Sequence, residues 1–106
     1  MTIQQDFDSL RVSGIRKLDA ANALVLQGSV SAVLTDTVKY IELDLSQTVF
    51  LDHCGLAMLI TLRNKLDRRG GVVRLLNPTP AAQHILQLTR LHLVMEVVNW
   101  EENLAA

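Results

Sequence analysis

Apolar and polar residues are interleaved along several short segments of the chain, a pattern typical of strands that bury one face. The clearest segment is Lys39–Leu45, which reads KYIELDL. Val72–Leu76 lies between the turn signals Gly70-Gly71 and Asn77-Pro78, which limit it to one short strand. Weaker patterns predict three more strands, over Ser9–Ile15, Val94–Val98 and Ile3–Phe7, the last of which is expected at an edge.

Between these strands, apolar residues recur at spacings of three and four, which indicates helices with one buried face. Each predicted helix follows a residue suited to the N-cap: Asp19 before Ala20–Leu34, Asp52 before Cys54–Arg69, Thr79 before a helix that begins at Pro80, and Asn99 before a short helix over Trp100–Leu104. The predicted buried faces are Ala23, Leu26, Val30 and Val33, then Gly55, Leu59, Leu62 and Leu66, then Ala82, Ile85, Leu86 and Thr89.

Strands that alternate with helices favour parallel pairing through crossover connections. We therefore expect an α/β fold with a small, largely parallel sheet and one layer of helices on one face. The length of 106 residues fits a single domain over residues 1–106.

Composition and charge narrow the class of protein. Ten basic and 11 acidic residues give a net charge of −1, which excludes a chain that binds nucleic acid over its whole surface. Its single cysteine, Cys54, excludes a disulfide within the chain. The first ten residues lack the apolar run of a secretory signal, and no apolar stretch approaches the roughly 18 residues of a membrane span. We therefore expect a cytoplasmic protein without direct membrane insertion.

The turn Phe50–Leu56 places three reactive side chains in a row, Asp52, His53 and Cys54, at a strand-to-helix junction. Ligands of open α/β sheets commonly bind at such a junction. A thiol at a helix start beside a histidine suggests thiol catalysis, but adjacent residues of a turn do not face each other. A small buried cysteine is therefore the simpler interpretation.

Metal, nucleotide and acid–base sites have equally weak support. The three side chains of this turn lack the spaced pairs of zinc ligands, and Asp19 and Asp52 are more simply explained as helix caps than as a catalytic pair. Gly70-Gly71 belongs to no phosphate-binding motif. We expect no catalytic residue, metal or cofactor.

One stripe of the second helix favours contact with another protein. Cys54, Met58, Thr61 and Lys65 recur at spacings of four, three and four, beside the predicted core face. The stripe is small and mildly apolar at the helix start and charged towards its end, which suits a partner protein better than a substrate. Plain exposure to solvent is the alternative.

Three segments, in this order, resemble the STAS domain of anti-sigma factor antagonists: LDAANA at 18–23, IELDLSQTVFLDHCGLAMLI at 41–60 and RLLNPTPAAQHILQLTRL at 74–91. The resemblance covers about Leu10 to Val98. It implies a mixed, mostly parallel sheet of four or five strands with helices on one side. It also implies a small regulatory protein that binds an anti-sigma factor, often a serine kinase, and has no catalysis of its own.

The resemblance also implies a regulatory turn, which departs from the family pattern in this chain. In the family motif D-S-S-G-L, the kinase phosphorylates the serine directly after the aspartate, and the added charge breaks the complex. Here that position is His53 and the next is Cys54, so the usual phospho-acceptor is absent. The expected partner-binding residues are Asp19, Asp52, His53, Cys54, Gly55, Met58 and Thr61.

Three functions follow from these patterns, in decreasing order of support. The first is an interaction module of the anti-sigma antagonist type that is not switched by serine phosphorylation at the usual place. The second is a STAS-like accessory subunit of an ATP-driven lipid transport system, and the third is an enzyme that uses Cys54. The sequence does not identify the partner and leaves the oligomeric state open, a weak dimer included.

Overall fold

A five-stranded sheet forms the centre of the computed structural model, which describes residues 1–99. Its strands are β1 (Thr2–Gln5), β2 (Ser9–Ser13), β4 (Tyr40–Asp44), β6 (Val72–Leu76) and β7 (Glu96–Val98). They lie in the order β1-β2-β4-β6-β7, with β1 antiparallel to β2 and the other neighbours parallel. The prediction of a mixed, mostly parallel sheet with a short first strand at its edge is confirmed.

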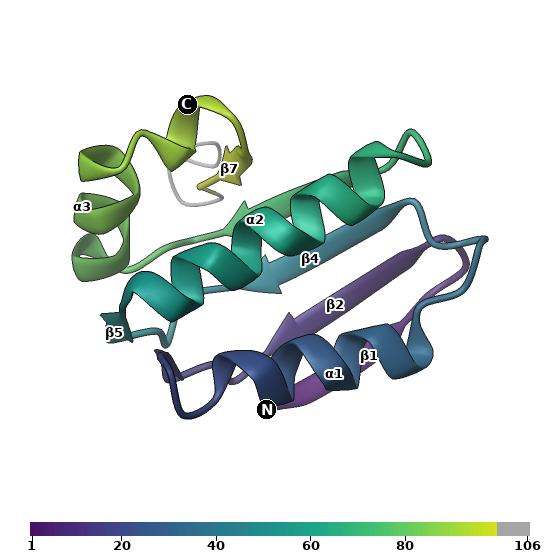
Figure 1. The fold of residues 1–106 in the computed structure, drawn as a ribbon, viewed down its shortest axis with the longest axis horizontal. Coiled ribbons are helices and arrows are strands. Elements are labelled where there is room, and N and C mark those ends of the chain that lie inside the picture. Colours follow the sequence, from purple (N-terminus) through teal and green to yellow (C-terminus); the bar gives the residue numbers. More distant parts are fainter. Residues whose placement is uncertain (100–106) are drawn as a thin grey trace.

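The helices are α1 (Ala23–Val33), α2 (His53–Asp67) and α3 (Pro80–Leu88), and a 3₁₀ turn, η1 (Leu91–Leu93), follows α3. Figure 1 shows α1 and α2 side by side over one face of the sheet, while α3 lies at the end towards which the parallel strands point. The same end carries a two-stranded parallel sheet of β3 (Lys17–Leu18) and β5 (Phe50–Leu51). The predicted helix over Trp100–Leu104 lies outside the described residues.

The core fills the space between the sheet and the two helices that cover it. Alternate residues of the central strands are buried, as the pattern predicted: Leu10, Val12, Ile41, Leu43, Val73 and Leu75. They form one cluster with Ala23, Leu26 and Val30 of α1 and with Leu59, Leu62 and Leu66 of α2. Two residues assigned to buried faces are exposed instead, Val33 and Thr89, because they lie at the last turns of α1 and α3.

Two of the three predicted N-caps within the described residues are confirmed. One Asp52 oxygen, Oδ1, accepts the N–H groups of Cys54 and Gly55 at 2.9 and 3.1 Å, and Thr79 Oγ1 accepts that of Ala82 at 3.2 Å. The prediction for Asp19 is wrong, because Asn22 is the N-cap of α1. The Asp19 carboxylate instead accepts backbone N–H groups of residues 21 and 22 and so closes a turn ahead of the helix.

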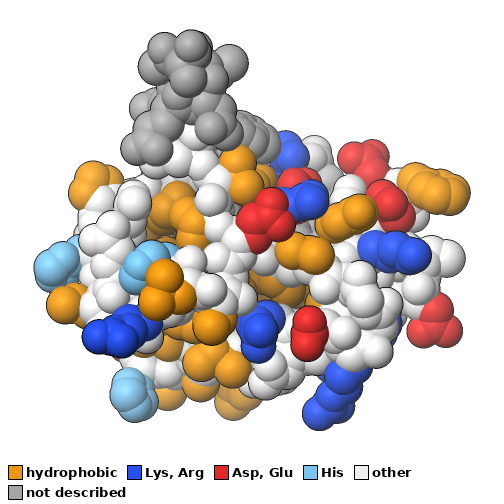
Figure 2. Space-filling view, turned by 90° about the horizontal axis from the view of Figure 1, so that it is seen from above, with side chains coloured by type: hydrophobic (Ala, Val, Ile, Leu, Met, Phe, Trp, Pro, Cys, Tyr) orange, Lys and Arg blue, Asp and Glu red, His pale blue; other side chains and the backbone are white. Residues whose placement is uncertain are grey.

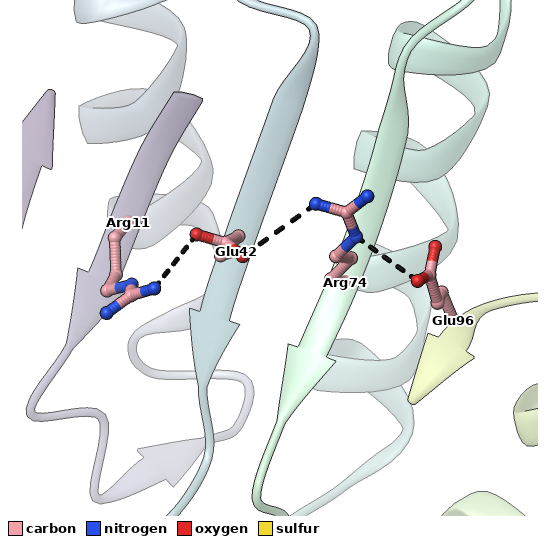
Figure 3. A network of polar contacts seen from close by, with 4 residues as sticks. All are labelled: Arg11, Glu42, Arg74 and Glu96. Carbon is pink, nitrogen blue, oxygen red and sulfur yellow. Dashed lines mark hydrogen bonds and ion pairs between the residues drawn. The ribbon is translucent and has the colours of Figure 1, made fainter. Parts of the chain in front are cut away.

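The other face of the sheet carries a row of alternating charges (Figure 3). Glu42 of β4 pairs with Arg11 of β2 at 3.1 Å and, more loosely, with Arg74 of β6 at 3.9 Å. Arg74 also pairs with Glu96 of β7 at 3.2 Å and lies over the Tyr40 ring, 4.5 Å from its centroid. These charges alternate in sign and pair with one another across four strands. Such partly exposed pairs add little stability each.

Within residues 1–99, no helix is long and apolar enough to cross a membrane.

The inner face of α2 should dominate stability. We expect Leu59→Ala or Leu62→Ala to lower the free energy of unfolding by about 2–5 kcal/mol, because both side chains are fully buried in the core. Thr61→Ala, on the exposed side of the same helix, is the control and should change it by less than about 0.5 kcal/mol. Chemical denaturation measures all three, and losses below about 1 kcal/mol for both leucines would contradict the assigned core.

Candidate functional site

The turn between β5 and α2 is held in place by a single carboxylate. Besides capping α2 through Oδ1, Asp52 accepts the N–H of Ala20 on Oδ2 at 3.2 Å. Its own N–H donates to the carbonyl of Leu18 at 3.0 Å. Asp52 therefore ties the start of α2 to the loop that leads into α1, and the two segments form one surface at the end of the sheet towards which the parallel strands point (Figure 1).

The structure brings Asp19 and Asp52 to this surface, but not as a catalytic pair. Asp19 directly precedes Ala20, whose N–H donates to Asp52. Each of the two carboxylates accepts hydrogen bonds from backbone N–H groups. Both side chains are half-buried, and both do the work of shaping a turn. Asn22 completes this loop by accepting the N–H of Asp19 at 2.9 Å and donating to the Lys17 carbonyl.

His53 and Cys54 occupy the first turn of α2, and both are exposed. The interpretation of Cys54 as a buried residue is therefore wrong: it is Gly55, one position later, that lies against the neighbouring strand β3. Among residues 1–99, no three His, Cys, Asp or Glu side chains are arranged to hold a metal ion. What the turn offers is an accessible imidazole and thiol on a fixed backbone.

Two residues predicted to bind a partner are buried and cannot do so directly. Gly55 packs so closely on Leu18 that a β-carbon there would overlap the Leu18 carbonyl oxygen. Met58 is 3% exposed and belongs to the core. The predicted stripe of α2 runs beside α1, since Lys65 Nζ donates to Ser31 Oγ at 3.3 Å. Within the stripe only Met58 is buried, while Cys54 and Thr61 are exposed. Met58→Asp would place an unpaired charge in the core and would not test an interface.

Sequence reasoning missed a group of exposed hydrophobic side chains on the segments that flank the turn. Leu24 and Val25 in the first turn of α1 are 77% and 63% exposed, and Val49 and Phe50 at β5 are 57% and 50% exposed. We call these four residues, together with His53 and Cys54, the turn surface. A partial signal was present in the pairs Leu24-Val25 and Val49-Phe50, because successive side chains of a helix or strand point in different directions and one of each pair is therefore expected off the core face.

The sequence matches the profile of one protein family. The profile of the STAS domain matches residues 2–105. The chain belongs to the STAS domain family. A comparison with curated protein sequences found no match.

Solved structures with the same fold include anti-sigma factor antagonists. SpoIIAA in its unphosphorylated form is 19% identical with a TM-score of 0.80, over 97% of this chain and 91% of that one. The Bacillus cell fate determinant SpoIIAA in the phosphorylated form is 20% identical with a TM-score of 0.72, over 98% of this chain and 96% of that one. An antagonist from Mycobacterium paratuberculosis is 26% identical with a TM-score of 0.73, over 91% of this chain and 81% of that one.

The fold also occurs within a membrane transporter. The murine anion transporter Slc26a9 matches 80% of this chain with 14% of its own length, at a TM-score of 0.64 and 18% identity. Likeness of fold therefore does not by itself choose between a sigma-factor regulator and a transport subunit, and the choice depends on the surface that this chain presents.

Proposed function

We propose that this STAS domain is a non-catalytic, cytoplasmic interaction module of the anti-sigma antagonist type, which binds an anti-sigma factor through the turn surface. The observation that carries the proposal is the exposed, hydrogen-bonded start of α2 with four exposed hydrophobic side chains on the segments beside it. Exposed hydrophobic side chains gathered on segments at one end of a small domain indicate a protein interface more often than a substrate site.

The proposal includes an altered switch. Phosphorylated and unphosphorylated forms of SpoIIAA are both known as structures. In this chain the residue after Asp52 is His53, which has no hydroxyl group to accept a phosphate from a serine kinase. We therefore propose that the turn surface stays competent to bind its partner and is not released by serine phosphorylation at this position.

A binding role fits the chemistry of the turn better than an enzymatic one. Both oxygens of Asp52 accept backbone hydrogen bonds, so this carboxylate is committed to shape rather than to proton transfer. His53 and Cys54 follow each other on a helical turn, where successive side chains diverge by about 100°. Such side chains suit contact with a partner more than transfer of a proton from thiol to imidazole.

The test is binding to the anti-sigma factors of the native host, measured by titration calorimetry. We expect Phe50→Asp and Leu24→Asp each to weaken binding by about thirtyfold, corresponding to a loss of about 2 kcal/mol at a buried interface position. Each introduces a charge where the free protein is exposed, so the fold should be kept.

Phe7→Asp is the matched control. Phe7 is 93% exposed and lies between β1 and β2, at the opposite end of the sheet from the turn surface. The control should bind as the unaltered chain does. Equal affinity of all variants would move the interface elsewhere, and association with a transporter ATPase instead of an anti-sigma factor would support the accessory-subunit alternative.

A further inference from the structure

We propose that the groove between α2 and η1 binds an acidic, amphipathic helical segment of the partner, an inference that rests on the proposed function. The groove has a volume of about 580 Å³ and is open to solvent. Six of its lining residues carry the argument: His53, Leu56, Ile60 and Arg63 on α2, and Arg90 and Val94 on either side of η1.

One wall of the groove is a straight stripe along α2. His53, Leu56, Ile60 and Arg63 recur at spacings of three, four and three, which places them on one face of the helix. At 1.5 Å per residue the stripe is about 15 Å long, which is enough to receive about three turns of a second helix. The opposite wall is tied to it, because Arg63 Nε donates to the Val94 carbonyl at 3.0 Å.

The floor and edges of the groove are apolar. Ile60 is 41% exposed and Val94 is 52% exposed, while Leu56 is partly buried against the core. Figure 2 views the molecule from the side of α3 and η1 and shows hydrophobic side chains gathered between those of basic residues and histidines. An apolar helix face laid along this stripe would remove these side chains from water, as in helix-in-groove recognition.

The charge of the groove selects the polar face of that helix. Two arginines and one histidine line it, and none of the described lining residues is acidic. Arg90 is exposed in the left-handed turn that leads from α3 into η1. Positive side chains at both walls favour Glu and Asp beside the apolar stripe of the incoming helix and disfavour Lys and Arg.

The groove also continues the turn surface. His53 belongs to both, so a partner that covers the turn would reach the groove without a gap. This continuity favours a segment of the same partner over a small molecule or a second copy of the chain.

The probe is a fluorescein-labelled peptide of 14 residues, with leucines at helical spacings of three and four and glutamates on both flanks. Fluorescence anisotropy measures its binding to the full chain. A peptide with lysine in place of every glutamate, and one with serine in place of every leucine, are the matched probes. We expect the glutamate peptide to bind about tenfold more tightly than either.

Variants of the chain assign the site. Arg90→Glu should weaken binding of the glutamate peptide about tenfold and strengthen that of the lysine peptide, and Ile60→Asp should abolish both. Phe7→Asp, which lies outside both the groove and the turn surface, should change neither. Binding that is independent of peptide charge, or unaltered by both Arg90→Glu and Ile60→Asp, would overturn the proposal. If the chain self-associates and Ile60→Asp abolishes this self-association, the groove binds a second copy of the chain, which would also overturn the proposal.

Comparison with the anti-sigma factor separates this inference from the proposed function. If Phe50→Asp weakens binding of the anti-sigma factor while Ile60→Asp and Arg90→Glu do not, the function stands and the groove proposal falls. If the peptide binds as expected and no anti-sigma factor does, the proposed function falls and the groove remains a site for an acidic helix of another partner. Arg90 is exposed, so its variant remains informative even if Ile60→Asp unfolds the chain.

Discussion

Replacing Gly55 with alanine should lower the free energy of unfolding by about 3 kcal/mol, an effect like that of overpacking a well-packed core. The added β-carbon would overlap the Leu18 carbonyl oxygen and lie 2.8 Å from both the carbonyl carbon and the β-carbon of Leu18. Because most of this obstacle is backbone, no change of rotamer relieves it. In the variant, the start of α2 would have to move away from β3, which would strain the hydrogen bond from the Asp52 N–H to the Leu18 carbonyl, 3.0 Å long in the unaltered chain.

Gly28→Ala in α1 is the matched control for this prediction. A β-carbon at Gly28 meets nothing within 4 Å, so the change should stabilise the chain by about 0.5–1 kcal/mol through helix propensity. Chemical denaturation compares the two variants, and calorimetry with the partner shows whether a displaced α2 also weakens binding. A loss below about 1 kcal/mol for Gly55→Ala would mean that α2 and β3 are not locked together at this residue.

The sequence predicts an element well where its own pattern contains both the buried face and the boundaries. β6 spans Val72–Leu76 as predicted, because glycines precede it and Asn77-Pro78 follow it. α3 begins at Pro80 as predicted, because Thr79 caps the helix and proline suits its first position. The end of the chain is less predictable: residues from Val94 were assigned to a strand, but β7 starts at Glu96, after η1. Leu91, the first residue of η1, and Met95, which follows η1, are both buried, and this packing decides the boundary.

The candidate site was predictable only as far as it depends on local chemistry. Asp52 caps α2 as expected, because an aspartate ahead of an apolar helix stabilises its first N–H groups wherever the helix lies. Met58 is buried in a core that includes residues of α1 and of the sheet, and Phe50 pairs with Lys17 in the two-stranded sheet. The accessibility of both residues therefore depends on distant parts of the chain. The groove likewise needs η1 beside α2. Spacing alone shows which residues share a face, but not which neighbour covers that face.

His53→Ser should convert the chain into a substrate of a serine-kinase partner and make its binding sensitive to ATP. His53 is exposed in the first turn of α2, and its exchange leaves the Asp52 cap and the close packing of Gly55 intact. A phosphate at this helix start is compatible with the free protein, because helix N-termini favour anions. In the complex it would place a charge of about −1.5 to −2 inside the turn surface and release the partner.

Intact-mass spectrometry after incubation with the kinase and ATP measures the modification, and calorimetry of the product measures release. We expect one phosphate on His53→Ser, none on the unaltered chain and none on the control His53→Ala, with non-acidic handling so that a phosphohistidine would survive.

A phosphate on His53 of the unaltered chain would make this a histidine-based switch and refute an unswitched binder. A phosphate on Ser46 or Thr61, which are both exposed, would relocate the switch. Thr48 is a poor acceptor by comparison, since it is fully buried and donates to the Ile15 carbonyl at 2.6 Å. No phosphate on any variant would show that the partner is not a kinase, which favours the transport-subunit alternative.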